Sequence, residues 1–318
     1  MSKLNLSWFF NLFNYKQRVI RYKTTDGKKL SLKDGLFDAN ITSHNYDREG
    51  VIVFDKPITR IEETAFCECE ELKSIVIPDN VTFIGNRAFC MCSNLEDVTL
   101  PKNLQTIEYS TFAACNKLQA INIPSSVTEI GSRSFLECEN LQIISIPMGV
   151  TKISDECFSG CTNLRRAHIP YTITTIEHRA FGECTSLTDI TLSDRLKTIG
   201  EYAFAWCKKL QSIEIPDSVT EIGSSAFQDC EKLKSVSIGS KVENLHANTF
   251  TGCERLRRFY CKPTTPPRCY KSLHMFDYNT CSMVPINTYI FVPTKSMGAY
   301  KQSDYWSVYA EKIRPHVF

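Results

Sequence analysis

Apolar residues recur along this chain with a period of 23 residues. Each repeat carries a phenylalanine, then a cysteine three positions later and a leucine six positions later. Nine copies follow one another without an insertion, and their phenylalanines are Phe66, Phe89, Phe112, Phe135, Phe158, Phe181, Phe204, Phe227 and Phe250. Self-similarity at one short period is the signature of a stacked repeat architecture. We therefore predict a solenoid in which each coil buries its apolar positions against its neighbours.

Each repeat predicts one strand and one turn region. The pattern L-x-x-I-x-I, as in Leu72, Ile75 and Ile77, alternates apolar and polar residues at its end, which predicts a strand with alternate side chains inward. A proline often follows, and its missing N–H ends the ladder. The second half, V-x-x-I-G-x-x-A-F-x-x-C, has apolar spacings of three and four, which predict a short helical or 3-10 turn. A glycine would supply a permissive bend there, at Gly85, Gly131, Gly200 and Gly223.

The register continues beyond the nine copies. Counting back 23 residues from the first repeat places a leading strand at 51–54. Counting forward places a last strand at 290–293, displaced by 31 residues from the strand at 259–261. The eight extra residues then belong to a loop that contains Pro263, Pro266 and Pro267.

Both ends of such a stack expose apolar edges and need caps. Upstream, residues 19–22 and 29–32 flank Asp26-Gly27, which predicts a β-hairpin. Downstream, we predict an amphipathic cap built from Tyr300, Tyr305, Trp306, Tyr309 and Ile313. The predicted organisation is an N-terminal cap with a β-hairpin at 1–49, the solenoid at 50–293, and a C-terminal cap at 294–318.

The repeat pattern resembles the BspA-type leucine-rich repeats of bacterial and some protozoan proteins, over about residues 50–293. The segment from Val292-Pro293 to Ile313 is also similar to the end of Bacteroides-type members. We therefore expect an α/β solenoid: a leucine-rich repeat right-handed superhelix of 23-residue coils, with a parallel β-sheet on one face and a cap at each end. The resemblance further implies a binding protein, because members are commonly surface or secreted and some adhere to host proteins.

Composition and charge add exclusions. The chain of 318 residues is 42% hydrophobic and 23% charged, with a formal net charge of +2, which is typical of a soluble folded protein. Because no basic excess covers the chain, we expect no nucleic-acid partner. No run approaches the ~20 apolar residues of a transmembrane helix, so we expect no membrane insertion.

The N-terminus bears on location. Apolar residues 8–13 are interrupted by Asn11, and no small-residue cleavage site follows before Lys16. We interpret this segment as a lead-in or cap, with a signal peptide as the alternative. We accordingly expect a cytoplasmic location by default, and the family resemblance gives the cell surface or secretion as the alternative.

Fifteen cysteines raise the question of chemistry. Nine occupy one repeat position and form a ladder, for which we predict a packing role, because free cysteine is usually a small buried hydrophobe. Disulfides or a metal chain are the alternative. Two C-x-C pairs one repeat apart (Cys67, Cys69, Cys90 and Cys92) could hold zinc, but the usual C-x₂-C spacing is absent. We expect no cofactor.

No catalytic signature is present in the sequence. It contains no G-x-S-x-G, phosphate-binding P-loop, H-E-x-x-H or dinucleotide-binding motif, and no histidine pair at metal-ligand spacing. We therefore expect that the protein is not an enzyme. A zinc-binding or enzymatic protein is the least favoured alternative.

The residues that alternate with the core on each strand point outward and vary from copy to copy. A regular core with a variable outer face is how repeat scaffolds present a binding surface. We expect a monomer that binds a protein of unknown identity with an acidic surface; a surface-displayed or secreted adhesin for host or matrix proteins is the alternative. An apolar residue beside arginines favours an interaction site, whereas a solvated charge cluster is the competing interpretation. The candidate partner-binding residues are Ile143, Arg165, Arg166, His168, Asp189, Arg258 and Tyr260.

Overall fold

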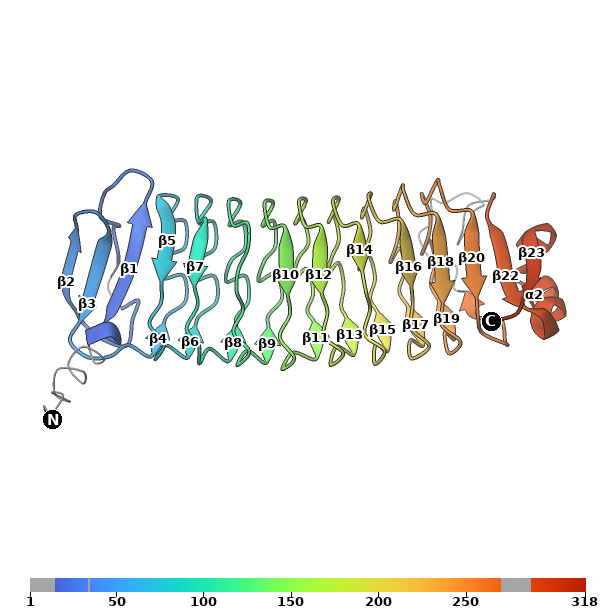
Figure 1. Cartoon of the computed structure of the whole chain (residues 1–318), viewed down its shortest axis with the longest axis horizontal. Coiled ribbons are helices and arrows are strands. Elements are labelled where there is room, and N and C mark those ends of the chain that lie inside the picture. The colour runs from blue at the N-terminus through green and yellow to red at the C-terminus, as the bar shows by residue number, and fades with distance from the viewer. Residues whose placement is uncertain (1–14, 34, 270–286) are drawn as a thin grey trace, which may run out of the picture. The chain divides into compact units, whose positions relative to one another are not determined.

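The structure is a computed structural model that describes residues 15–33, 35–269 and 287–318. It comprises two compact units, one ending at Leu141 and one beginning at Gln142. Within each unit, 23-residue coils stack as a parallel β-solenoid. The strands on one side of the coils are longer, except for the two-residue β14, and those on the other side have two residues each (Figure 1). The predicted solenoid of 23-residue repeats is confirmed, because neighbouring strands in both units pair at an offset of 23 residues.

The first unit has one large sheet in the order β2-β3-β1-β5-β7, and two short pairs, β4-β6 and β8-β9. Their bounds are β1 Val19–Thr24, β2 Ile41–Tyr46, β3 Gly50–Phe54, β4 Arg60–Ile61, β5 Leu72–Val76, β6 Phe83–Ile84, β7 Asp97–Thr99, β8 Thr106–Ile107 and β9 Glu129–Ile130. The next repeat buries Ile121 and Ile123 as expected, but the residues around them form no strand. Its outward residues are Ala120 and Asn122, types that are depleted in strands.

The predicted N-terminal hairpin is wrong. Residues 29–32 form no strand, and β1 instead lies between β3 and β5, antiparallel to both. An isolated two-stranded hairpin is only marginally stable, whereas the observed position gives β1 hydrogen-bonding partners on both edges. Tyr22 of β1 is buried and faces Gly50 of β3. A Cβ on Gly50 would lie 2.0 Å from Cζ of Tyr22, so only glycine fits there.

The leading strand forms as predicted, but it does not pair with its repeat neighbour. On the sheet side, β1 separates β3 from β5. On the opposite side of the same coil, β4 pairs directly with β6, and Ile61 lies beside Ile84 at the expected 23-residue offset. The first coil therefore keeps the repeat register on the side of β4. On the side of β3, the added strand β1 separates it from the next coil.

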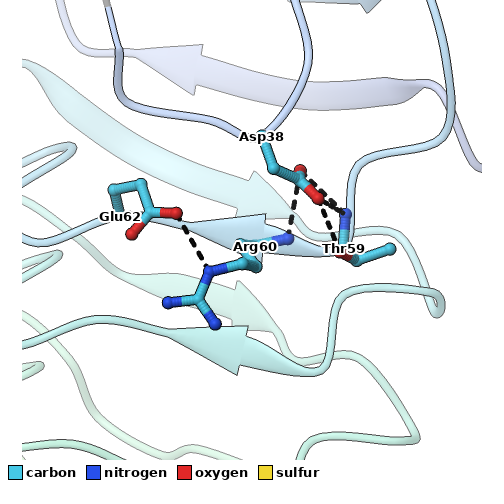
Figure 2. A network of polar contacts seen from close by, with 4 residues as sticks. All are labelled: Asp38, Thr59, Arg60 and Glu62. Carbon is cyan, nitrogen blue, oxygen red and sulfur yellow. Dashed lines mark hydrogen bonds and ion pairs between the residues drawn. The ribbon is translucent and has the colours of Figure 1, made fainter.

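A carboxylate joins the N-terminal segment to the first coil (Figure 2). Asp38 accepts hydrogen bonds from the backbone N–H groups of Thr59, at 3.0 Å, and Arg60, at 3.2 Å, and from the Thr59 hydroxyl. Arg60 Nε in turn donates to Glu62 at 3.0 Å. Burial opposes ionisation of Asp38, but these hydrogen bonds outweigh it and lower its pKa.

The second unit contains the remaining elements. Its sheets have the orders β10-β12-β14, β16-β18-β20-β22-β23 and β11-β13-β15-β17-β19-β21. The strand bounds are β10 Ile143–Ser145, β11 Lys152–Ile153, β12 Arg166–His168, β13 Thr175–Ile176, β14 Asp189–Ile190, β15 Thr198–Ile199, β16 Ser212–Glu214, β17 Glu221–Ile222, β18 Ser235–Ile238, β19 Asn244–Leu245, β20 Arg258–Cys261, β21 Arg268–Cys269, β22 Tyr289–Pro293 and β23 Ile313–His316. Short helices connect the last two strands: η1 Thr294–Ser296, α2 Met297–Gln302 and η2 Ser307–Lys312.

The C-terminal segment packs largely as predicted. The 31-residue displacement is confirmed, because Phe259 pairs with Ile290. Tyr300, Trp306 and Tyr309 are buried, and Tyr305 is half-buried. The loop prolines anchor two of these rings: the Tyr300 hydroxyl donates to the carbonyl of Pro263 at 2.8 Å, and Trp306 Nε1 to that of Pro267 at 3.0 Å. Ile313 opens β23, a further strand that pairs with β22 at the 23-residue offset, although the sequence predicts this residue to be part of the cap.

The predicted helical turns do not form between the two strands of a coil. The chain instead makes successive tight turns separated by residues in the left-handed region, such as Tyr202 (φ 54°) and Trp206 (φ 60°). Backbone donors alternate there in direction. Phe204 N–H donates to Ala226 of the next coil at 2.7 Å, whereas Ala205 N–H donates to Tyr202 of its own coil at 3.0 Å. The hydrogen bonds between coils stabilise a conformation that a helix cannot provide, because helical N–H groups bond within their own segment.

The repeat glycine also has a different role from the predicted one. Gly131 does not adopt a positive φ; its N–H donates to the carbonyl of Ile107 at 2.7 Å. A Cβ at this position would lie 2.9 Å from backbone atoms of Glu108 and Tyr109. At Gly131 the glycine therefore accommodates the close approach of the preceding coil and does not supply a permissive bend. Other coils hold Glu108, Ser154, Glu177 and His246 at the same repeat position.

The phenylalanine ladder forms the centre of each unit. Adjacent rings stack at 5.1–5.6 Å between centroids in the first unit and 5.2–5.4 Å in the second, with interplanar angles of 5–14°. All nine side chains are fully buried. Each ring therefore contributes burial to its own coil and to the neighbouring coils.

We expect Phe204→Ala to lower the free energy of unfolding by about 3–5 kcal/mol, because truncation leaves a cavity between Phe181 and Phe227. Ile143→Ala, at a half-exposed outward position, should change it by about 0.5 kcal/mol or less. Urea unfolding followed by circular dichroism measures both. Equal, small losses at the two positions would contradict the stacked core.

We expect Asp38→Ala to destabilise the first unit by about 1 kcal/mol at pH 7, because Thr59 and Arg60 lose a charged acceptor. The folded-state pKa lies below the unfolded value of about 3.9. The contribution is therefore present above about pH 4 and is lost as the pH falls through the folded-state pKa. Urea unfolding at pH 7 and below pH 3 should show a smaller difference from wild type in acid; an equal difference at both would contradict it.

Candidate functional site

The structure brings together four of the predicted residues on the outer side of the sheet β10-β12-β14. Ile143, Arg166 and Asp189 occupy one row across the three strands, and His168 lies in the next row beside Ser145. All four point outward, because the alternate residues Ile144, Ala167 and Ile190 are buried. Arg165 is exposed just before β12, and its N–H donates to the carbonyl of Gln142 at 2.9 Å.

A hollow opens beside this row. It has a volume of about 430 Å³, and Arg166, His168 and Asp189 line it together with Met148, Pro170 and Thr191. Ile143 is 48% exposed, and Met148 is 66% exposed. The apolar side chains of Ile143 and Met148 are therefore exposed to water close to Arg166 and His168.

Sequence reasoning missed Met148 and its neighbour on the next coil, Tyr171, which is 56% exposed. A sequence signal for both exists. They occupy the position directly after the strand-ending proline (or its equivalent), which elsewhere holds Asp79, Lys102, Ser125, Asp194, Asp217 and Ser240. Exposed apolar residues at a position that is polar in the other repeats indicate a site of interaction with another molecule.

A second hollow, of about 560 Å³, continues along the same side of the unit and shares Asp189, Ile190 and Thr191 with the first. Its additional charged residues are Asp194, Glu214, Asp217 and Lys262. Glu214 and Lys262 form an ion pair at 3.5 Å. The outer side of the unit thus changes from cationic and apolar at β12 to mainly acidic at β14 and β16.

The structure does not bring the remaining two predicted residues to this site. Arg258 and Tyr260 lie on β20, and the coils of β14, β16 and β18 separate that strand from β12. Tyr260 stacks on Phe291 of β22, with centroids 4.9 Å apart and an interplanar angle of 20°. The seven candidates therefore form two separate surfaces.

Comparison with known protein families shows to which family this chain belongs. The sequence matches the BspA type leucine rich repeat region in six copies, over residues 59–188 and 174–292. The chain belongs to this family. The BspA-type repeat accounts for the 23-residue coil and for its phenylalanine and cysteine ladders. Among curated proteins, none matches the sequence.

Solved structures with a similar fold include the following two. A leucine-rich repeat protein from Bacteroides ovatus is 24% identical, with a TM-score of 0.55, and the match covers 83% of this chain and 76% of that one. The pneumococcal vaccine antigen PcpA is 19% identical, with a TM-score of 0.51, and the match covers 83% and 72%. At these identities the likeness concerns the fold alone.

The cysteine of the BspA-type repeat does more than pack. In both units its thiol donates to the backbone carbonyl of the phenylalanine 26 residues earlier, for example Cys115 to Phe89 at 3.2 Å and Cys207 to Phe181 at 3.3 Å. Burial raises the pKa of both thiols far above the ordinary value. These cysteines are neutral hydrogen-bond donors inside the stack, so they lack the thiolate that a nucleophile or metal ligand requires.

The two C-x-C pairs are more accessible than the ladder. Cys67, Cys69 and Cys90 are half-buried, and Cys92 is buried. Burial raises the pKa of Cys69 and of Cys90 to about 11, and it also raises the pKa of Cys67. Within residues 15–33, 35–269 and 287–318, no group of three or more histidine, cysteine or acidic side chains is arranged to hold a metal ion. No helix in these ranges is both long enough and apolar enough to cross a bilayer.

We expect thiol titration of the native protein at pH 7.5 to detect slow reaction at Cys67, Cys69 and Cys90 only among the described cysteines, because the ladder thiols are buried and neutral. Cys67→Ser should remove part of the reacting fraction. After denaturation without reductant, all fifteen thiols should react. A substantial shortfall in that sample would reveal disulfides and contradict the assignment.

Proposed function

We propose that this protein is a non-enzymatic protein-binding scaffold that uses the outer side of the sheet β10-β12-β14. The hollow bounded by Met148, Arg166 and His168 is the observation that carries the proposal. It places the exposed side chain of Met148 beside Arg166 in a concave place, and exposed Ile143 lies next to Arg166 in the same row. Apolar contact area beside arginine is the composition of interaction sites with high binding energy.

We infer the chemistry of the partner from that of the site. Arg165 and Arg166 attract carboxylates, while Ile143 and Met148 offer apolar contact area of the kind that a partner would bury. Asp189 lies beside Arg166 across the strands and limits the cationic patch on that side. A partner that fits carries an acidic residue next to an apolar one. Its association should slow as salt rises, because exposed charges are screened.

Export as a surface adhesin for host or matrix proteins is the alternative function, and it stays a prediction. Fractionating cells that express the chain and probing the medium, envelope and cytoplasm with an antibody distinguishes the two. Binding to a protein partner is common to both, so the scaffold role and the location are separate questions.

We expect Arg165→Glu/Arg166→Glu to weaken partner binding at least tenfold, because two attractive charges become repulsive. Binding peptides selected from a random display library on the wild-type chain supply the ligand, and titration calorimetry measures their affinity. Lys208→Glu/Lys209→Glu changes the net charge equally at exposed positions outside the hollow and should leave binding unchanged. Circular dichroism verifies that both variants fold. Undiminished binding to the folded Arg165/Arg166 variant would exclude this site.

A further inference from the structure

Aromatic side chains gather on the outer side of the last three strands of the second unit, β20, β22 and β23, which lie side by side (Figure 1). Tyr260 stacks on Phe291 at 4.9 Å, and the His316 ring lies 5.3 Å from Tyr260 and 5.9 Å from Phe291. These three are half-buried, and Tyr289, one row away, is 44% exposed. The other strands of this sheet carry serine or glutamate in the same two rows.

Cations surround these rings. The Arg314 guanidinium lies 5.2 Å and the Lys312 ammonium 5.6 Å from the centroid of the Tyr289 ring. Arg258 is exposed on β20, directly beside Tyr289. Among the residues that the structure describes, none of these three cations has a carboxylate oxygen within 4.0 Å. Arg314 instead donates to the backbone carbonyls of Glu311 and Ile313. Within the described ranges, no carboxylate therefore neutralises this positive charge.

We propose that this surface, defined by Arg258, Tyr260, Tyr289, Phe291, Lys312 and Arg314 and here called the terminal surface, binds an acidic peptide segment of a partner protein. It goes beyond the proposed function, because it lies outside the hollow at β12 and carries its own charge. Charge complementarity selects the ligand: three unpaired cations form a continuous group with rings that supply apolar contact area.

The arrangement of the rings favours a peptide over a single-stranded nucleic acid. Nucleic-acid platforms bind bases on free aromatic faces. Here Tyr260 and Phe291 cover each other's facing surfaces, and cations lie over the Tyr289 ring. Ring edges and cationic head groups are the features that a peptide carboxylate can use here. Ring edges carry partial positive charge, so both features attract carboxylates.

Strand geometry gives the spacing of the acidic residues. Arg258 on β20 lies beside Tyr289 on β22. Lys312 comes 23 residues after Tyr289 and directly precedes β23, so it lies one strand further across the sheet. Two strand spacings amount to roughly 10 Å. Side chains at positions i and i+4 of an extended peptide share one face about 13 Å apart, so they can meet the long Arg258 and Lys312 side chains together. The segment that fits best carries glutamates four residues apart, with an apolar residue midway between them on the same face for contact with Tyr289.

The test uses the full chain and a fluorescein-labelled twelve-residue peptide that contains glutamates at every fourth position separated by Thr-Leu-Thr. Fluorescence anisotropy at 50 mM salt should show saturable binding that weakens as salt increases. Arg258→Glu/Arg314→Glu should weaken it at least tenfold, and Arg258→Lys/Arg314→Lys should retain most of the affinity. Lys102→Glu/Lys117→Glu, which changes the net charge equally in the first unit, should leave it unchanged. Phe291→Leu, which keeps the charge, should weaken it severalfold.

Several outcomes overturn the proposal. One is equal loss of binding in the Lys102/Lys117 variant, since that shows a response to net charge alone. Another is tighter binding of a labelled oligo-dT or a sulfated oligosaccharide than of the peptide, which would assign the terminal surface to a different ligand class. Undiminished binding to a folded Arg258/Arg314 variant is the third. Loss in Arg165→Glu/Arg166→Glu alone would place the acidic segment in the hollow instead.

Discussion

The dependence of every coil on its neighbours governs this structure. A 23-residue coil has too few apolar residues to close a core of its own, so it buries them against the coils before and after it. Its backbone imposes the same requirement. In the turns, N–H groups alternate between an acceptor in the same coil and one in the next, as Ala205 and Phe204 show. An insertion within a coil would break these bonds. Among the strand pairs that the structure describes, the 31-residue offset between β20 and β22 accordingly lies near the end of the second unit.

Because equivalent positions stack directly, each side chain meets copies of itself, and this decides which residue types fit. Phenylalanine rings stack face to face at a separation that matches the coil spacing. The cysteine lies where its thiol meets a backbone carbonyl of the preceding coil, and a small neutral donor can satisfy that carbonyl without bringing in charge. Residues with left-handed φ values also recur in every coil. Hydrogen bonds between neighbouring coils stabilise them and offset their local backbone strain.

The outward rows are free of this constraint, and the functional proposals rest on them. Between β10 and β16 the outer side of the second unit changes from arginine with exposed Ile143 and Met148 to a mainly acidic hollow. Farther along, the terminal surface adds unpaired cations among packed rings. A stack whose core accepts little variation can still vary its ligand preferences, because substitutions in these rows alter charge and apolar exposure without altering the ladders.

The sequence alone determined the features that repeat: the coil length, the buried slots, the two ladders and the rows that face water. Periodicity encodes these because the same local offset applies in every copy. It also located Ile143, Arg166, His168 and Asp189 on one side. Only the tertiary structure decided the insertion of β1 beside Gly50, the turns in place of helical segments, and the hollow beside Met148. Those features depend on which non-repeating segment captures a free sheet edge and on contacts between coils, and no periodic signal along the chain records either.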